Sequence, residues 1–141
     1  MEKACLDTGV LVELARRRLI RYVDRGLGLH LTFITFYEYL RGLAYLGRDL
    51  EASKDELENR FQVIWPSNRA LMLAAEIYSV LRRKGQLISD PDIIIGSLCI
   101  SSGAPLATFN KQHFTRLKHY GLELIDPEEV FTLVERSQQS L

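Results

Sequence analysis

Short apolar runs typical of buried β-strands alternate with longer helical patterns along almost the whole sequence. The strand-like runs cover residues 3–6, 29–34, 61–65, 106–109 and 121–125, and helical segments separate them. Strands that alternate with helices pair in parallel, because each helix carries the chain back across the sheet. The sequence therefore predicts a three-layer α/β/α fold with a mainly parallel sheet of about five strands.

The helical patterns and the absence of any linker or internal repeat predict one domain over residues 1–141. Helices are expected over 10–18, 19–25, 35–46, 49–59, 68–84, the segment from Ser89 to Gly103, 111–118, and from Asp126 to about Glu135. The polar tail 136–141 is expected to fray.

The segment from Leu87 to Ile100 contains the helix that is expected to be most deeply buried. Ser89 and Asp90 are capping residue types, and Pro91 suits the first turn, where an N–H is not needed. The residues after Asp92 are apolar on nearly every side of the helix, which indicates burial. A carboxylate at the start of such a helix must be capped, paired or bound to a cation.

Overall composition excludes few functions. Lysine and arginine together number 18, as do aspartate and glutamate, so the net charge favours no particular partner. Cys5 and Cys99 lie in apolar runs without metal-ligand spacing and are expected to be buried thiols. No apolar run approaches the roughly 18 residues of a membrane span. No signal-peptide pattern begins the sequence, so a cytoplasmic protein without a membrane segment is expected.

Polar side chains stand where successive strands meet the next helix. Asp7, Glu38 and Asn110 lie just after a predicted strand or within the following turn, and Asp92 opens a helix in a similar place. Because the carboxyl ends of parallel strands share one edge of a sheet, these residues are expected to converge there. Oxygen ligands of this kind suit Mg²⁺ or Mn²⁺, which can activate water for phosphodiester hydrolysis.

Helix capping is the alternative explanation for each of these positions, because the same residue types cap helices. The candidate caps are Asp7 or Thr8 for the first helix, Thr35 with Glu38, Ser89 with Asp92, and Asn110.

Four sequence blocks together resemble the motif blocks of PIN domains. They are LDTGV from Leu6, ITFYEYLRG around Glu38, ISDPDIIIGSLCI around Asp92 and LATFNKQHF from Leu106. Their order and spacing are most similar to those of VapC-type toxins of toxin–antitoxin pairs. The resemblance extends from Leu6 to about Leu124.

The resemblance implies a Mg²⁺- or Mn²⁺-dependent endoribonuclease that cleaves RNA. Asp7, Glu38 and Asp92 match the family's first three acids and would be its catalytic metal ligands. It further implies a homodimer and a small antitoxin partner that fills the acidic cleft.

Two positions depart from the family pattern. Asn110 stands where a further aspartate is frequent, with His113 three residues later, and Gly9 replaces the usual asparagine. These departures predict one firmly held ion, with a second recruited together with substrate. Thr8 matches the family's hydroxyl neighbour, which would orient Asp7 or a bound water.

Two further residues are candidates for a supporting role. Arg41 shares a helix face with Glu38 and would contact phosphate, or would simply pair with Glu38 three residues earlier. Asp90 would lie behind the metal-binding acids without binding the ion itself, or would cap its helix.

Two other functions remain open from the sequence. One is a PIN-like domain that binds RNA or protein without catalysis. The other is a phosphohydrolase with Asp7 as nucleophile, although such enzymes normally carry a second aspartate where Gly9 stands.

Overall fold

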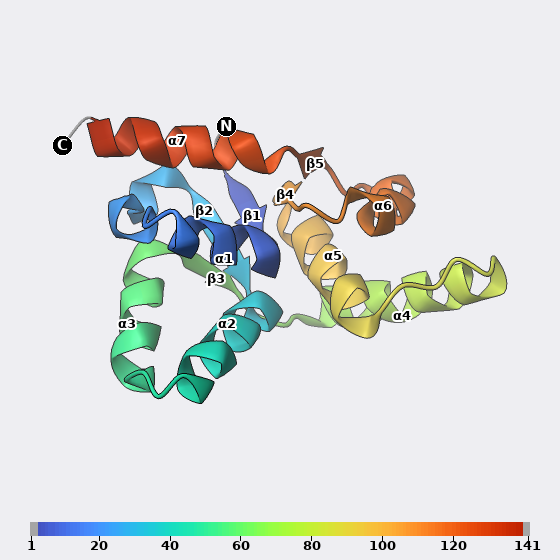
Figure 1. Cartoon of the computed structure of the whole chain (residues 1–141). Coiled ribbons are helices and arrows are strands. Elements are labelled where there is room, and N and C mark those ends of the chain that lie inside the picture. Colours follow the sequence, from blue (N-terminus) through green and yellow to red (C-terminus); the bar gives the residue numbers. More distant parts are fainter. Residues whose placement is uncertain (1–2, 140–141) are drawn as a thin grey trace.

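The computed structural model describes residues 3–139 and contains a sheet with helices on both faces (Figure 1). The strands are β1 (Ala4–Leu6), β2 (Leu29–Thr32), β3 (Gln62–Ile64), β4 (Leu106–Ala107) and β5 (Leu124–Ile125). The helices are α1 (Thr8–Arg16), α2 (Phe33–Tyr45), α3 (Leu50–Arg60), α4 (Asn68–Arg83), α5 (Asp90–Ser102), α6 (Lys111–Phe114) and α7 (Pro127–Gln139). Short 3₁₀ turns occur at Ile20–Tyr22, Arg25–Leu27 and Thr115–Tyr120.

The five strands pair in the order β3-β2-β1-β4-β5, and every pairing is parallel. The predicted fold is therefore confirmed. The chain builds outward from β1 through β2 to β3, then crosses to the other side of β1 to form β4. The strand order thus reverses between β1 and β4, and the crevice at such a point is where open α/β sheets bind ligands.

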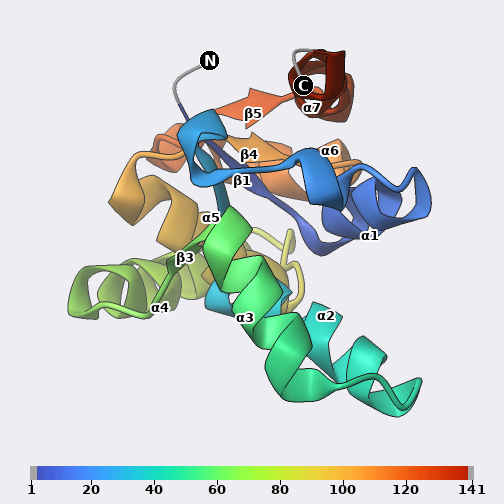
Figure 2. The ribbon, with the colours of Figure 1, turned by 90° about the vertical axis from the view of Figure 1, so that its left-hand side faces the viewer.

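Alternate residues of β1 point into the two apolar cores. Ala4 and Leu6 pack with α1, α7 and the start of α2, whereas Cys5 packs on the other face with α4 and α5. All three residues are completely buried. Figures 1 and 2 show α5 beside the sheet, with α7 and α1 on its opposite side.

Helix α5 is buried as its sequence predicts, with Ile93, Ile95 and Leu98 in the interior. Gly96 permits a close approach by the side chain of Leu117. A Cβ at position 96 would overlap Leu117 Cδ2. Cys5 and Cys99 are buried free thiols, as predicted.

Several predicted boundaries are wrong. Helix α2 begins at Phe33 rather than Thr35, because Thr32 caps it. The predicted helix 19–25 is replaced by the first two 3₁₀ turns, which follow Arg18 with its positive φ of 59°. The tail expected to fray is helical as far as Gln139, and residues 140–141 lie outside the described part of the chain.

No helix among residues 3–139 combines the length and the apolar character that crossing a membrane requires.

Candidate active site

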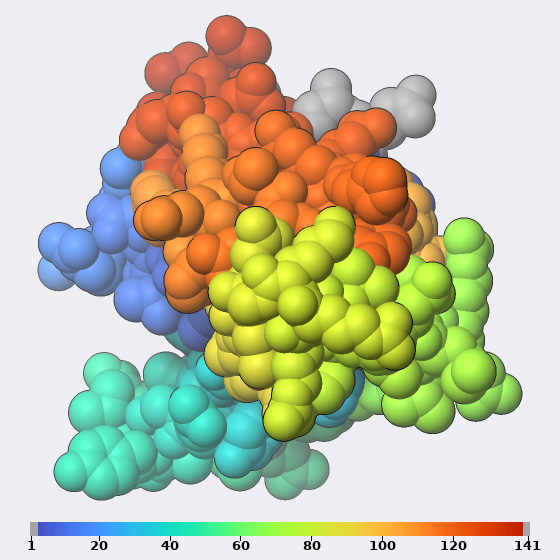
Figure 3. All heavy atoms as spheres, turned by 90° about the vertical axis from the view of Figure 1, so that its right-hand side faces the viewer, coloured from blue at the N-terminus to red at the C-terminus, as the bar shows by residue number. Residues whose placement is uncertain are grey.

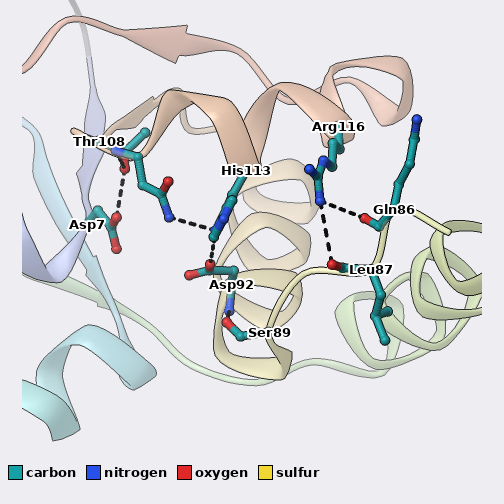
Figure 4. Close-up of polar contacts among 9 residues, drawn as sticks. Asp7, Gln86, Leu87, Ser89, Asp92, Thr108, His113 and Arg116 are labelled. Carbon is teal, nitrogen blue, oxygen red and sulfur yellow. Dashed lines mark hydrogen bonds and ion pairs between the residues drawn. The ribbon is translucent and has the colours of Figure 1, made fainter.

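Asp7 directly follows β1 and lies beside the point where the strand order reverses. It caps α1, because its Oδ1 accepts a hydrogen bond of 2.9 Å from the backbone N–H of Thr8. Its Oδ2 accepts a second hydrogen bond, of 2.7 Å, from the hydroxyl of Thr108 (Figure 4). Capping therefore uses one oxygen of Asp7 and leaves the carboxylate available for further contacts.

Glu38 lies in the second turn of α2 and is not a capping residue. The hydroxyl of Thr32 accepts the N–H of Thr35 at 3.3 Å, so the capping box proposed for Thr35 and Glu38 is wrong. The hydroxyl of Thr8 instead donates to Glu38 Oε1 over 2.7 Å. Thr8 thus contacts two acids, Asp7 through its backbone and Glu38 through its side chain. The hydroxyl thus contacts Glu38 rather than Asp7, and its alternative role of orienting a bound water stays a prediction.

Asp92 lies in the first turn of α5. Ser89 caps this helix by accepting the N–H of Asp92 at 3.4 Å. The carboxylate of Asp92 lies against His113, with 3.2 Å between Asp92 Oδ2 and His113 Nδ1 (Figure 4). Asp90 is the first residue of α5 and is exposed, so the prediction that it caps the helix is wrong.

Asn110 stands at the start of α6 without capping it through its side chain. Its Nδ2 lies 2.8 Å from His113 Nδ1, so the amide and the imidazole form a pair beside Asp92. Asn110 therefore contacts His113, and His113 in turn contacts Asp92, the third acid.

Thr108 is a site residue that the sequence analysis missed. Its fully buried hydroxyl donates to Asp7 and accepts the backbone N–H of Asn110 at 2.9 Å. A continuous chain of contacts consequently runs from Asp7 through Thr108, Asn110 and His113 to Asp92. The available signal was position, because Thr108 follows β4 as Asp7 follows β1.

The electrostatics of Asp7 connect the three acids. Burial is the largest influence and raises the pKa of the Asp7 carboxyl above its ordinary value. Hydrogen bonds from Thr108 and from the Thr8 backbone oppose this rise, and the negative charges of Asp92 and Glu38 add to it. Asp92 and Glu38 therefore lie near enough to Asp7 for their charges to act on its carboxyl, which is in line with the predicted convergence.

The donor chemistry of this cluster fits a hard divalent cation. Three carboxylates supply only oxygen ligands, which Mg²⁺ and Mn²⁺ prefer, and mutual repulsion among them favours binding of positive charge. Within residues 3–139, no three His, Cys, Asp or Glu side chains stand together as a ready-made metal site.

The cationic side chains near the cluster have different surroundings. Arg41 is 60% exposed, lies 3.8 Å from Glu38 Oε2 and stacks over the ring of Tyr37. Arg116 instead donates to the carbonyl oxygens of Gln86 and Leu87, which fixes the segment after β4 to the loop before α5. Figure 3 shows the orange segment after β4 directly above that yellow loop.

The chain matches the family model described as PIN domain over residues 4–120. It is 32% identical over 124 residues to a protein of Methanocaldococcus jannaschii named Ribonuclease VapC1, and the match covers 88% of each chain. It is 24% identical to a VapC ribonuclease of Pyrococcus furiosus over 76% of this chain and 72% of that protein.

The fold also matches solved structures of toxin–antitoxin complexes. VapBC-1 from nontypeable Haemophilus influenzae superimposes with a TM-score of 0.70 at 21% identity, over 89% of this chain and 98% of that one. DNA-bound VapBC from Salmonella typhimurium gives a TM-score of 0.69 at 23% identity, over 90% and 99% of the two chains.

Proposed function

The chain belongs to the PIN domain family, and from that premise we propose that it is a ribonuclease that hydrolyses phosphodiester bonds in RNA. We propose Asp7, Glu38 and Asp92 as its catalytic residues and as the ligands of Mg²⁺ or Mn²⁺. The names of the two archaeal relatives support the activity. The phosphohydrolase alternative has no such support.

One observation supports this choice of residues more than any other. Asp92 and Glu38, although distant from Asp7 in sequence, are close enough to raise the pKa of its carboxyl together with burial. Helix capping alone does not require such proximity, since each helix could be capped without reference to the others. A cluster of negative charge is, in contrast, what a cation site requires.

The residues of the chain would prepare the site in three ways. Two hydrogen bonds fix the Asp7 carboxylate, and each of its oxygens retains lone-pair capacity for a cation. Thr8 fixes one oxygen of Glu38. The exposed guanidinium of Arg41 would contact a phosphate beside the scissile bond. A divalent cation, when bound, would lower the pKa of a bound water and offset charge on the leaving oxygen.

The test is conservative substitution of each acid. Asp7→Asn, Glu38→Gln and Asp92→Asn should each abolish metal-dependent cleavage of single-stranded RNA while the protein remains folded. Asp49→Asn is the matched control, because Asp49 also caps a helix, through a hydrogen bond from Ala52 N, but the helix that it caps is α3. Wild-type cleavage by any of the three variants would mean that the residue concerned serves only the fold.

Metal binding can be measured without cleavage. An ion that binds only the folded protein raises the melting temperature by mass action. Millimolar Mg²⁺ or Mn²⁺ should therefore raise the melting temperature of wild type, and of Asp92→Asn much less. An equal rise in both proteins would place the bound ion elsewhere.

We further propose that the protein acts in the cytoplasm as the toxin of a toxin–antitoxin pair, with a small antitoxin partner, and forms a homodimer. The solved complexes of similar fold support the partner. Production of the chain with and without the product of an adjacent short reading frame tests this proposal. Growth arrest that the neighbouring product does not relieve would refute it, and light scattering would give the oligomeric state.

A further inference from the structure

Phe109 is an exposed aromatic residue at the edge of the acidic cluster. Its side chain is 60% exposed, although its neighbours Thr108 and Asn110 are held in the contacts around Asp7 and His113. A phenylalanine ring gains stability by burial. The exposed part of this ring is available to a molecule that binds at the acidic cluster.

The surroundings of the ring hold it in place without covering it. Phe109 packs against the fully buried ring of Phe131, with 6.2 Å between centroids and 31° between planes. The Arg17 guanidinium lies 4.1 Å from the centroid of Phe131. On the α1 side the neighbour is Gly9, where an added Cβ would touch Phe109 Cδ2 at 3.7 Å. This distance is an ordinary van der Waals contact, so the start of α1 lies against this edge of the ring and helps to hold it.

We infer that Phe109 forms a subsite that stacks one unpaired base of the RNA next to the scissile phosphate; this inference rests on the proposed ribonuclease function. Single-stranded RNA is recognised largely by stacking its bases on aromatic side chains. A ring already held by Phe131 binds a base with little loss of side-chain entropy.

The local chemistry favours a base over a protein partner. Asn110 and the half-exposed Lys111 follow the ring, so polar groups border it on this side, and Lys111 lies 3.6 Å from the exposed carboxylate of Asp126. A protein interface requires a wider apolar centre. One aromatic ring bordered by polar and cationic groups suits one base with its phosphate.

The experiment measures binding of a short single-stranded RNA of mixed sequence with Ca²⁺ as the cation, and a gel confirms that the RNA stays intact. Trp65 is the only tryptophan, so Phe109→Trp in a Trp65→Phe background places a single fluorophore at the subsite. RNA should quench this fluorescence, and an abasic ribose-phosphate strand of equal length should not.

Substitutions separate stacking from simple apolar contact. Phe109→Ala and Phe109→Leu should each weaken RNA binding on the order of ten-fold, because neither retains an aromatic face. Phe109→Tyr should bind like wild type. Tyr45→Ala, which removes a 91% exposed aromatic ring at the far end of α2, is the matched control and should bind unchanged. Melting temperatures identify variants that fail to fold.

The outcomes are distinguishable. Tight binding by Phe109→Leu, or equal quenching by the abasic strand, would refute base stacking even if the protein cleaves RNA. If antitoxin binding rather than RNA binding is lost in Phe109→Ala, the ring is a protein contact. If wild type neither binds nor cleaves RNA, both this subsite and the proposed function are wrong.

Discussion

Replacement of Thr108 by valine removes one hydroxyl and keeps the shape of the side chain. The hydroxyl donates to the Asp7 carboxylate over 2.7 Å and accepts the N–H of Asn110 over 2.9 Å. A hydrogen bond to a charged group contributes about 1.5–3 kcal/mol and a neutral one about 0.5–1.5 kcal/mol. Thr108→Val should therefore lower the free energy of unfolding at neutral pH by about 2–4 kcal/mol.

A double-mutant cycle with Asp7→Asn isolates the contribution of the charge. Asp7→Asn removes the charge, so Thr108→Val in that background breaks two neutral hydrogen bonds and should lower the free energy of unfolding by about 1–3 kcal/mol, less than in wild type. Urea denaturation of the four proteins gives the coupling free energy. Thr108→Ser, which retains the hydroxyl, is the control and should stay closer to wild type than valine does. An equal cost of Thr108→Val in both backgrounds would refute the reasoning, because the hydroxyl would then not stabilise the ionised acid.

The same cycle predicts a pH dependence of known sign. Burial raises the Asp7 pKa, so in the window above the ordinary aspartate pKa the native state binds more protons than the unfolded state. Stability contributed by this group therefore falls as pH rises through that window. The Thr108 hydrogen bond lowers the Asp7 pKa, so its removal extends the window upward. The loss in free energy of unfolding caused by Thr108→Val should thus increase as pH rises. In the Asp7→Asn background this increase should be absent.

Two further substitutions test the packing of α5 and the fourth position of the cluster. Gly96→Ala should destabilise the protein by about 1–3 kcal/mol through overlap with Leu117, whereas Gly42→Ala, with open space around position 42, should stabilise it slightly; urea denaturation compares them. Asn110→Asp should lower the metal concentration for half-maximal thermal stabilisation, and Asn110→Ala should weaken cleavage far less than Asp92→Asn. Unchanged half-saturation in Asn110→Asp, with full activity in Asn110→Ala, would place Asn110 outside the site.

The sheet could be predicted because its signals are local. Each strand is a short apolar run, and helices α1 to α5 each begin after a residue whose side chain caps them, such as Ser67 or Ser89. The start of α2 was misplaced for the same reason. Thr32 and Thr35 are both good caps, and only the pairing of β2 with β3 determines that the strand ends at Thr32.

The convergence of the acids could be predicted from topology, but their partners could not. Asp7 and Thr108 are 101 positions apart, and Asp92 and His113 are 21 apart. Strand order brings each pair together, and the sequence does not state that β4 lies next to β1. Thr108 also looks like an ordinary buried strand residue. Its polar role becomes visible only when the neighbouring strand end is known to carry Asp7.

The partners of the three acids share a property that bears on cation binding. Asp7 and Glu38 are each oriented by a threonine hydroxyl, and Asp92 by an imidazole, which is charged only when protonated. A lysine or buried arginine in these places would also orient a carboxylate, but it would cancel the negative charge that attracts a cation. The nearby Arg41 is largely exposed, so solvent screens its interaction with Glu38. None of these partners carries a permanent positive charge, so the negative charge of the cluster stays available to a metal ion.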